Sequence, residues 1–131
     1  MIVLDTHAWI WWVASPEQLS DRARGEIDRA KEHKEICISS ISCWEIALLV
    51  RKGRLELTIP VGEWIAKSET LPFVQFIPLD NRIALDSNQL LGELHEDPAD
   101  RIIIATALVL GAPLVSKDTK IRDYPHVRTV W

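Results

Sequence analysis

Four acidic residues, widely separated along the 131-residue sequence, are the candidates for chemistry: Asp5, Glu45, Asp100 and Asp118. Asp5 directly follows a short apolar run at 1–4, and Asp118 closely follows another at 114–116. Short apolar runs are typical of buried parallel strands, and open α/β sheets bind ligands at the carboxyl ends of their strands. Both residues are therefore candidate site residues. A helix cap is the alternative for Asp5, because Asp is a common cap.

Glu45 lies in a segment, 40–52, that is expected to form a helix closed by basic residues and Gly53. Its neighbours on the same helix face are not basic. The helix is apolar almost all round, which predicts burial. An ionised carboxylate buried without a partner is costly, so Glu45 is expected either to bind a divalent cation or to pair with a distant arginine.

A third acidic cluster, Asp97-Pro98-Ala99-Asp100-Arg101, precedes a long apolar stretch. Asp before Pro is typical of a helix start, so we interpret Asp97 as the N-cap rather than as a ligand. Asp100 falls at the third helical position, where the helix dipole favours a carboxylate. Because the helix body is expected to be buried, its start should direct Asp100 toward Asp5 and Asp118 at the sheet edge.

Four carboxylates in one place form an oxygen-only site, which suits hard cations such as Mg²⁺ or Mn²⁺. Two such ions about 4 Å apart can activate water and stabilise the leaving oxygen of a phosphodiester. The alternative is four unrelated caps and ion pairs. No Ser-His-Asp or Cys-His arrangement competes for the chemistry, and the histidines lack the spacing of a metal motif: His7, His33, His95 and His126.

The hydrophobic pattern predicts the elements that position these acids. Strands are expected at 1–4, 36–39, 73–79, 114–116 and 127–130, and helices at about 7–14, 21–33 with Ser20 as N-cap, 40–52, 61–70, 80–87 and 99–110, with a helical turn near 89–94. Alternating strands and helices indicate βαβ crossovers. The predicted fold is a three-layer α/β/α sandwich with a central, mostly parallel five-stranded sheet, spanning 1–131 as a single domain.

Composition narrows the class of protein. Hydrophobic residues make up 47% and charged residues 26%, an ordinary globular balance, and no apolar run is long enough to span a bilayer. Cys37 and Cys43 lack the spacing of a disulfide framework or a zinc site and are interpreted as small buried hydrophobes. Without a basic and apolar leader, we expect a cytoplasmic location. The net charge of −4 argues against binding nucleic acid over the whole surface, but a nuclease site also concentrates carboxylates.

Four sequence blocks together resemble the PIN domains of the VapC toxin group, in the order in which that family carries them. They are Met1-Ile-Val-Leu-Asp5-Thr6-His7, Ser39-Ser-Ile-Ser-Cys-Trp44-Glu45-Ile46, His95-Glu-Asp97-Pro98-Ala-Asp100-Arg101 and Leu114-Val-Ser116-Lys-Asp118. The resemblance spans nearly the whole chain. It implies a PIN-like α/β/α fold and a Mg²⁺-dependent endoribonuclease, with Mn²⁺ as a substitute ion.

The resemblance also implies roles for single residues and partners. By position, Asp5, Glu45, Asp100 and Asp118 match the metal-binding and catalytic acids of the family. Thr6 matches a hydroxyl position that helps to hold water in the site, and Ser116 matches a position beside the site. RNA is the implied substrate, and a cognate antitoxin protein and a homodimer are the implied partners, with no membrane involved.

Two further groups of residues bear on partners. Trp9, Trp11 and Trp12 sweep most of the circumference of one short helix, so they cannot all face the core. An exposed tryptophan indicates an antitoxin or dimer interface, and the alternative is that these tryptophans serve the core alone. A set of basic residues either steers RNA phosphates toward the acidic site or is simply solvated: Arg51, Lys52, Arg54, Lys117, Lys120 and Arg122.

Two other functions stay open on the sequence. Acidic strand ends and Lys117 also suggest a phosphoacceptor, receiver-like signalling domain. That class needs an acidic pair after the first strand and an Asp at the end of the middle strand, whereas Thr6 follows Asp5 here. The other alternative is a PIN-fold RNA-binding module that keeps the pocket without turnover.

Overall fold

Five parallel strands form one sheet in the computed structural model, which describes residues 1–131. Their order is β3-β2-β1-β4-β5, and every neighbouring pair is parallel. The strands are β1 (Ile2–Leu4), β2 (Ile36–Ser39), β3 (Val74–Ile77), β4 (Leu114–Val115) and β5 (Thr129–Val130). All five predicted strands are present, and the sheet is entirely parallel where a mostly parallel one was expected.

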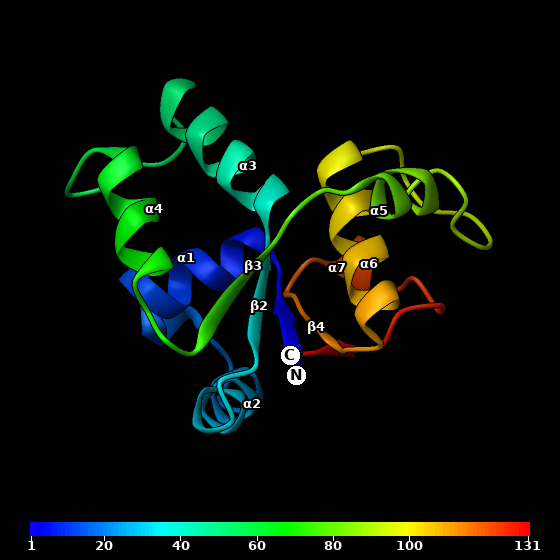
Figure 1. Ribbon diagram of the computed structural model, residues 1–131, viewed down its shortest axis with the longest axis horizontal. Coiled ribbons are helices and arrows are strands. Elements are labelled where there is room, and N and C mark those ends of the chain that lie inside the picture. The colour runs from blue at the N-terminus through cyan, green and yellow to red at the C-terminus, as the bar shows by residue number, and fades with distance from the viewer.

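Helices cover both faces of this sheet. One face carries α1 (Thr6–Ala14), α2 (Asp21–Glu32) and α4 (Val61–Glu69), and the other carries α5 (Asn81–Asp86), α6 (Pro98–Leu110) and α7 (Thr119–Arg122) (Figure 1). α3 (Ser40–Arg51) continues outward from the end of β2, and the short 3₁₀ helix η1 (Pro16–Gln18) follows α1. The predicted three-layer α/β/α sandwich is confirmed.

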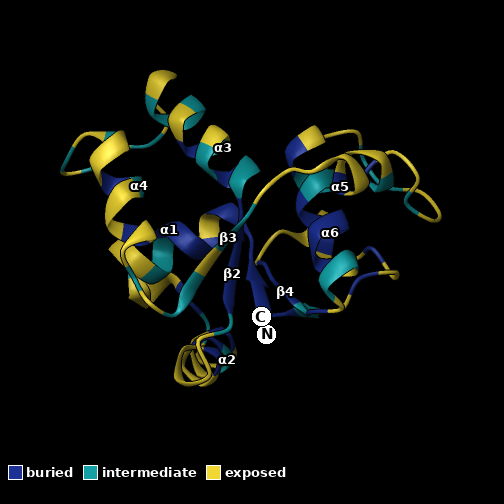
Figure 2. Ribbon diagram, viewed as in Figure 1, coloured by how far each residue is buried: buried dark blue, intermediate teal, exposed yellow.

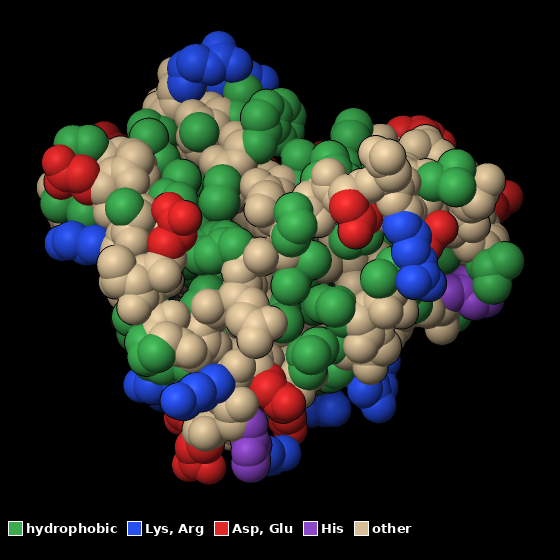
Figure 3. Space-filling model, in the orientation of Figure 1, with side chains coloured by type: hydrophobic (Ala, Val, Ile, Leu, Met, Phe, Trp, Pro, Cys, Tyr) green, Lys and Arg blue, Asp and Glu red, His purple; other side chains and the backbone are tan.

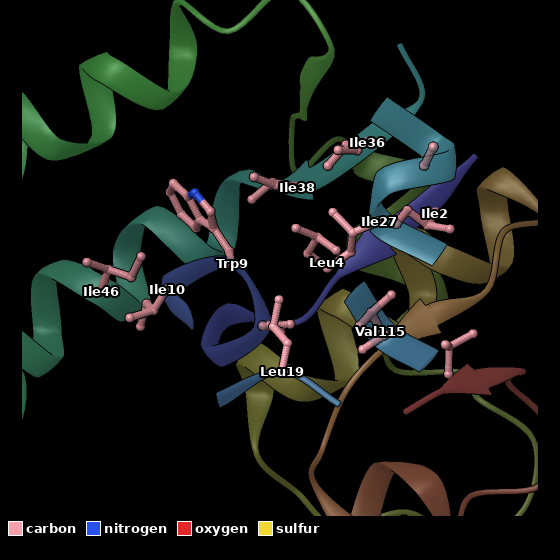
Figure 4. Close-up of a cluster of buried hydrophobic side chains, with 14 of the residues drawn as sticks. Ile2, Leu4, Trp9, Ile10, Leu19, Ile27, Ile36, Ile38, Ile46 and Val115 are labelled. Atoms are coloured by element: carbon pink, nitrogen blue, oxygen red, sulfur yellow. The ribbon is translucent and has the colours of Figure 1, made fainter. Parts of the chain in front are cut away.

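Alternation along the central strands produces two hydrophobic cores. Ile2 and Leu4 belong to one core and Val3 to the other, because successive side chains of a strand point to opposite faces. The register continues this division, since Ile2 pairs with Ile36 and Val3 with Cys37. Side chains of α1 to α4 complete the first core (Figure 4), and those of α6 and α7 complete the second. β1, β2 and β4 are buried throughout (Figure 2).

The predicted helix ends follow local chemistry. Ser20 and Asp97 cap α2 and α6 by accepting the backbone N–H groups of Ala23 and Asp100. Gly111 ends α6 with a φ of 63°, a left-handed conformation that glycine adopts without a Cβ clash. These three predicted boundaries are confirmed.

One expectation about local structure was wrong, and one short helix was not expected. Residues 89–94 form bends rather than a helical turn. Gly92 has a φ of 69°, and the carbonyls of Leu91 and Leu94 accept from the Tyr124 hydroxyl and the Arg101 guanidinium instead of from helical N–H groups. In the other case, Asp118 starts a helix, α7, that the hydrophobic period did not indicate because it has only 4 residues.

α3 is less buried than its apolar sequence predicts. Only Ser42 and Ile46 are buried in it, whereas the Trp44 side chain is 56% exposed. Because α3 extends past the end of the sheet, only part of its surface meets α1, α4 and α6. The expectation that this helix is buried all round was therefore wrong.

Cys37 is buried in the second core, as predicted, and Cys43 is half-buried against the first. No helix of the chain combines the length and the hydrophobicity needed to cross a membrane.

The strand order creates a crevice between β1 and β4. From β1 the chain builds outward through β2 to β3, then returns to form β4 and β5 on the other side of β1. The helices that follow β1 and those that precede and follow β4 therefore cover different faces (Figure 1). Such a topological switch point is where open α/β sheets bind ligands. Asp5 follows β1 directly, and Ser116 and Asp118 follow β4.

Candidate active site

Asp5 lies at the carboxyl end of the central strand and is only 7% exposed. Its Oδ1 accepts the backbone N–H of Thr6 at 2.8 Å, and its Oδ2 accepts the Ser116 hydroxyl at 2.7 Å. Burial raises the pKa of Asp5, and the two hydrogen bonds offset this only in part. Asp5 is thus both the cap of α1 and an enclosed acid at the switch point.

Ser116 joins the ends of β1 and β4. Its buried hydroxyl donates to Asp5 and accepts the backbone N–H of Asp118 at 3.1 Å. Asp118 is exposed and caps α7, with Oδ1 accepting the N–H groups of Lys120 and Ile121. These bonds hold the Asp118 carboxylate at the edge of the crevice.

Glu45 reaches the crevice from the first half of α3. The buried Thr6 hydroxyl is hydrogen-bonded to the Glu45 carboxylate and, at 2.9 Å, to the Ser42 hydroxyl. A hydroxyl carries one proton, so Thr6 accepts from Ser42 when it donates to Glu45. Burial is the largest cause of the raised pKa of Glu45, and the charges of Asp5 and Asp97 raise it further while the Thr6 bond lowers it.

The start of α6 brings further acids to the same place. Asp97 caps the helix through the Asp100 N–H at 3.0 Å, as predicted, and Asp100 Oδ2 lies 2.7 Å from His95 Nε2. Glu45, Asp97 and Asp100 each offer one oxygen, and these oxygens lie within 4.8 Å of one another. Asp97 is therefore a cap that also stands beside two other acids, a position that its Asp-Pro motif does not indicate.

The structure brings all four predicted acids into the wall of one pocket of about 680 Å³. Each comes from a different part of the fold: the end of β1, α3, α6 and the start of α7. The complete lining is Asp5, His7, Trp11, Glu45, His95, Asp97, Asp100, Lys117, Asp118, Thr119 and Lys120. The predicted supporting residues, Thr6 and Ser116, bond to two of these acids from behind.

No lysine or arginine neutralises these acids. The ion pairs of the chain lie elsewhere, apart from the contact of His95 with Asp100. Arg101 donates instead to the carbonyls of Ser87, Leu94 and His95. Burial, joined by the charges of Asp5, Asp97 and Glu45, raises the pKa of Asp100 to about 6 although its bond with His95 lowers it. The four predicted acids therefore share one pocket, and none of them forms an ion pair with a lysine or an arginine.

This set of donors fits a hard divalent cation. Carboxylate oxygens are the ligands that Mg²⁺ and Mn²⁺ prefer. Glu45, Asp97 and Asp100 supply the closest group of oxygens, and Asp5 is near enough for its charge to raise the pKa of both Glu45 and Asp100. A cation would offset the cost of burying these like charges together.

The receiver-like alternative does not fit the sheet. Receiver-type sheets have the strand order 2-1-3-4-5. Here β1 is central and β3 is at the edge. Asp80, which follows β3, caps α5 by accepting the N–H of Ile83.

The tryptophans of α1 face three directions, as predicted. Trp9 is buried and donates its indole N–H to Ser68, Trp12 packs against Phe73, and Trp11 lines the acidic pocket. Sequence reasoning missed the position of Trp11 in the pocket, and also that of His95. No spacing indicates His95, because an irregular loop brings it to Asp100.

The basic residues divide by position. Lys117 and Lys120 line the pocket, and Arg122 lines a neighbouring one. Three others are exposed around the outer end of α3, where Figure 3 shows a cluster of basic side chains: Arg51, Lys52 and Arg54. Of the predicted steering residues, only Lys117 and Lys120 adjoin the acids, and steering itself stays a prediction.

Comparison with known proteins adds sequence and fold relatives. The family model of the PIN domain matches residues 2–127. The chain is 36% identical over 132 residues to Ribonuclease VapC22 of Mycobacterium tuberculosis, covering 99% of this chain and 98% of that protein.

Solved structures show the same fold at low sequence identity. VapBC2 from Rickettsia felis, bound to a DNA fragment from its promoter, contains a chain that aligns with a TM-score of 0.72 at 18% identity, covering 98% of this chain and 97% of that one. A toxin–antitoxin complex from Klebsiella pneumoniae contains a chain that aligns with a TM-score of 0.64 at 19% identity, covering 96% and 93%.

Proposed function

The chain belongs to the PIN-domain family, within its VapC group, and from this premise we propose that it is a metal-dependent endoribonuclease. The observation that carries the proposal is the meeting of acids from four parts of the fold in one pocket, without a lysine or arginine paired to them. The name of the relative, Ribonuclease VapC22, supports RNA as the substrate.

The proposed reaction is hydrolysis of an RNA phosphodiester. A water oxygen loses a proton and forms a bond to phosphorus, while the bond from phosphorus to one ribose oxygen breaks and that oxygen takes up a proton. Mg²⁺, with Mn²⁺ as a substitute, is the proposed cofactor, held by Asp5, Glu45 and Asp100 with Asp97 and Asp118 beside them. When bound, the cation supplies Lewis-acid stabilisation of the charge that develops on the phosphate.

The chain's own residues orient these acids. Thr6 holds the Glu45 carboxylate, Ser116 holds that of Asp5, and His95 holds that of Asp100. Fixed carboxylates need no reorganisation when the substrate binds, which is the condition for electrostatic catalysis. Lys117 and Lys120, at the pocket wall, offset the charge of the approaching RNA backbone.

Cleavage of labelled RNA tests the proposal. We expect the parent protein to cut RNA with Mg²⁺ or Mn²⁺ and to stop in EDTA. Asp5→Asn and Glu45→Gln should abolish cleavage while circular dichroism shows an unchanged fold. Glu96→Gln is the matched control, because Glu96 is an exposed acid next to Asp97 in sequence but does not line the pocket.

Equal cleavage by the parent and both pocket variants at matched Mg²⁺ would remove the proposal. Binding of Mn²⁺ without turnover of any RNA would instead assign the chain to the RNA-binding modules of this fold.

We further propose that the chain is the toxin of a toxin–antitoxin pair, inhibited by a cognate antitoxin protein and assembled as a homodimer. The structural relatives support this, since one of them is a chain of a toxin–antitoxin complex. Three large hydrophobic side chains are exposed and can serve assembly: Trp44 of α3, Leu79 after β3 and Leu85 of α5. Figure 3 shows hydrophobic side chains at the surface of this face of the molecule. Growth arrest on expression, absent with Glu45→Gln, tests the toxin role.

A further inference from the structure

One hydrophobic side chain, Trp11, stands in the otherwise polar wall of the acidic pocket. The other tryptophans of α1 pack inward or against Phe73, but Trp11 is half-buried with part of its ring at the pocket. His7 lies one helical turn earlier, with ring centroids 5.6 Å apart. Trp11 also packs against the first core and against Trp131, with ring centroids 5.8 Å apart. Because an indole cannot serve a hard cation, which takes oxygen ligands, the part of Trp11 that lines the pocket suits another kind of ligand.

The same wall carries positive charge. Lys117 Nζ lies 5.6 Å from the centroid of the Trp11 ring, and Lys120 lines the pocket close by in the chain. Neither lysine forms an ion pair, although five acids line the same pocket: Asp5, Glu45, Asp97, Asp100 and Asp118. The pocket therefore has an acidic part and a part that combines an aromatic ring with unpaired cations.

We propose that this second part is a nucleotide-binding subsite, in which a base of single-stranded RNA stacks on Trp11 and its phosphate binds Lys117. The inference rests on the proposed ribonuclease function and specifies its substrate as an unpaired strand. Aromatic side chains stack on any base, and lysines neutralise the backbone. A duplex keeps its bases stacked on each other, so it presents no free base face to the indole.

The position of Trp11 sets which nucleotide it binds. Trp11 is six residues beyond Asp5, so its backbone stands roughly 9 Å along α1 from that of Asp5, and both residues line the same pocket. The stacked base therefore belongs to a nucleotide flanking the phosphodiester that is cut, not to a remote part of the RNA.

An abasic scan of the RNA tests the subsite on the unmodified protein. The probe is a labelled single strand whose cleavage point has been mapped in Mg²⁺, with bases removed one position at a time. Affinity is measured by fluorescence anisotropy, with Ca²⁺ replacing Mg²⁺ to keep the strand intact. We expect removal of the base at one position flanking the cut to lower the affinity of the strand for the protein about tenfold. The paired duplex should bind no more tightly than this abasic strand.

Protein variants identify the stacking residue. Trp11→Leu should lower the affinity for the intact strand about tenfold. It should cause no further loss of affinity for the strand that lacks the base identified by the scan. Trp11→Phe should keep most of the affinity for the intact strand. Trp12→Leu is the matched control on the same helix, since Trp12 packs against Phe73 outside the pocket. Lys117→Gln should lower the slope of log Kd against log salt by about 0.7, the value for one phosphate contact on a single strand.

The outcomes distinguish failure of this inference from failure of the proposed ribonuclease function. A parent protein that neither binds nor cuts RNA with any divalent cation overturns the proposed function. A parent that cuts RNA, with a flat abasic scan or with equal losses for Trp11→Leu on intact and abasic strands, overturns the subsite alone. Unchanged RNA affinity together with lost binding to a co-expressed antitoxin would assign Trp11 to a protein interface and also overturn it.

Discussion

Two buried hydroxyls decide where the acids of the pocket point. Ser116 donates to Asp5 and accepts from the Asp118 backbone, while Thr6 connects Glu45 to Ser42. Each hydroxyl stabilises the ionised form of its carboxylate, against the burial that disfavours it. Their removal should therefore change acidity as well as stability.

We expect Ser116→Ala to lower the free energy of unfolding by about 1–2 kcal/mol, because it removes the hydroxyl that donates to the buried Asp5 carboxylate and accepts the backbone N–H of Asp118. Loss of the bond should also raise the pKa of Asp5, so the acidic limb of the pH–rate profile should move to higher pH. Thr106→Ala is the control: its buried hydroxyl donates to the Ile102 carbonyl within α6, away from the pocket. An equal shift of the limb in both variants would contradict this role for Ser116.

The raised pKa of Asp100 predicts a pH dependence of stability. Its folded-state value is about 6, above the ordinary 3.8, so the folded protein holds this proton more tightly than the unfolded chain. The resulting stabilisation is fully present below pH 3.8 and is lost as pH rises through about 6. In metal-free protein at pH 7, Asp100→Asn should therefore raise the free energy of unfolding, by about 1 kcal/mol after allowance for solvent screening.

Urea unfolding at several pH values measures this effect. Added Mn²⁺ should stabilise the parent more than the variant, because the cation takes the place of the proton that Asp100 has lost at this pH. Asp28→Asn, on the exposed side of α2, should show neither change. A metal-free Asp100→Asn protein less stable than the parent at pH 7 would contradict the electrostatic account of the site.

Among the helices, α6 links folding to the site most directly. Its cap, Asp97, stands within 4.8 Å of the Glu45 and Asp100 oxygens, so the charge that starts the helix also belongs to the pocket. The dipole of the helix favours both of its early acids. Substitutions at Asp97 can separate its role as helix cap from its proposed role as a cation ligand.

Asp97→Asn should keep the stability of the metal-free protein, because Asn caps a helix as well as Asp does. Asp97→Ala should cost about 1 kcal/mol. Both should weaken Mn²⁺ binding, measured by titration, because both remove the charge. Asp80→Asn is the matched control, a cap of α5 outside the pocket. Parent-like Mn²⁺ affinity in Asp97→Asn would restrict Asp97 to the cap that its sequence motif predicts.

Across the whole molecule, the exposed hydrophobic side chains around α3 and α5 suggest that the chain does not act alone. Trp44 and Leu85 are 56% and 57% exposed, more than a core position allows. The parent should be a dimer by size-exclusion chromatography with light scattering, and Trp44→Glu should be a monomer. Leu91→Glu is the control, because Leu91 is an exposed loop residue whose carbonyl, not its side chain, accepts from the Tyr124 hydroxyl. This variant should remain a dimer. A monomeric parent would contradict the proposed assembly.

The order of strands and helices was predictable because it depends on short-range chemistry. Apolar runs, the caps at Ser20 and Asp97 and the glycine at Gly111 are readable within a few residues. Even the acids at the ends of β1 and β4 follow from where those strands stop. The short helix α7 was missed because four residues are too few to show a helical period. The bends at 89–94 were missed because side chains of neighbouring segments, Arg101 and Tyr124, hold their carbonyls.

The residue types needed for a cation site and the sheet that gathers them could thus be read from the chain itself. What required the folded molecule was the environment of each side chain: the raised pKa of Asp5, Glu45 and Asp100, the second role of Asp97, and the place of Trp11 at the pocket. Burial and charge coupling act through space between distant positions. Ser116 and Asp5 share a hydrogen bond across 111 residues of sequence, and no local pattern encodes such a contact.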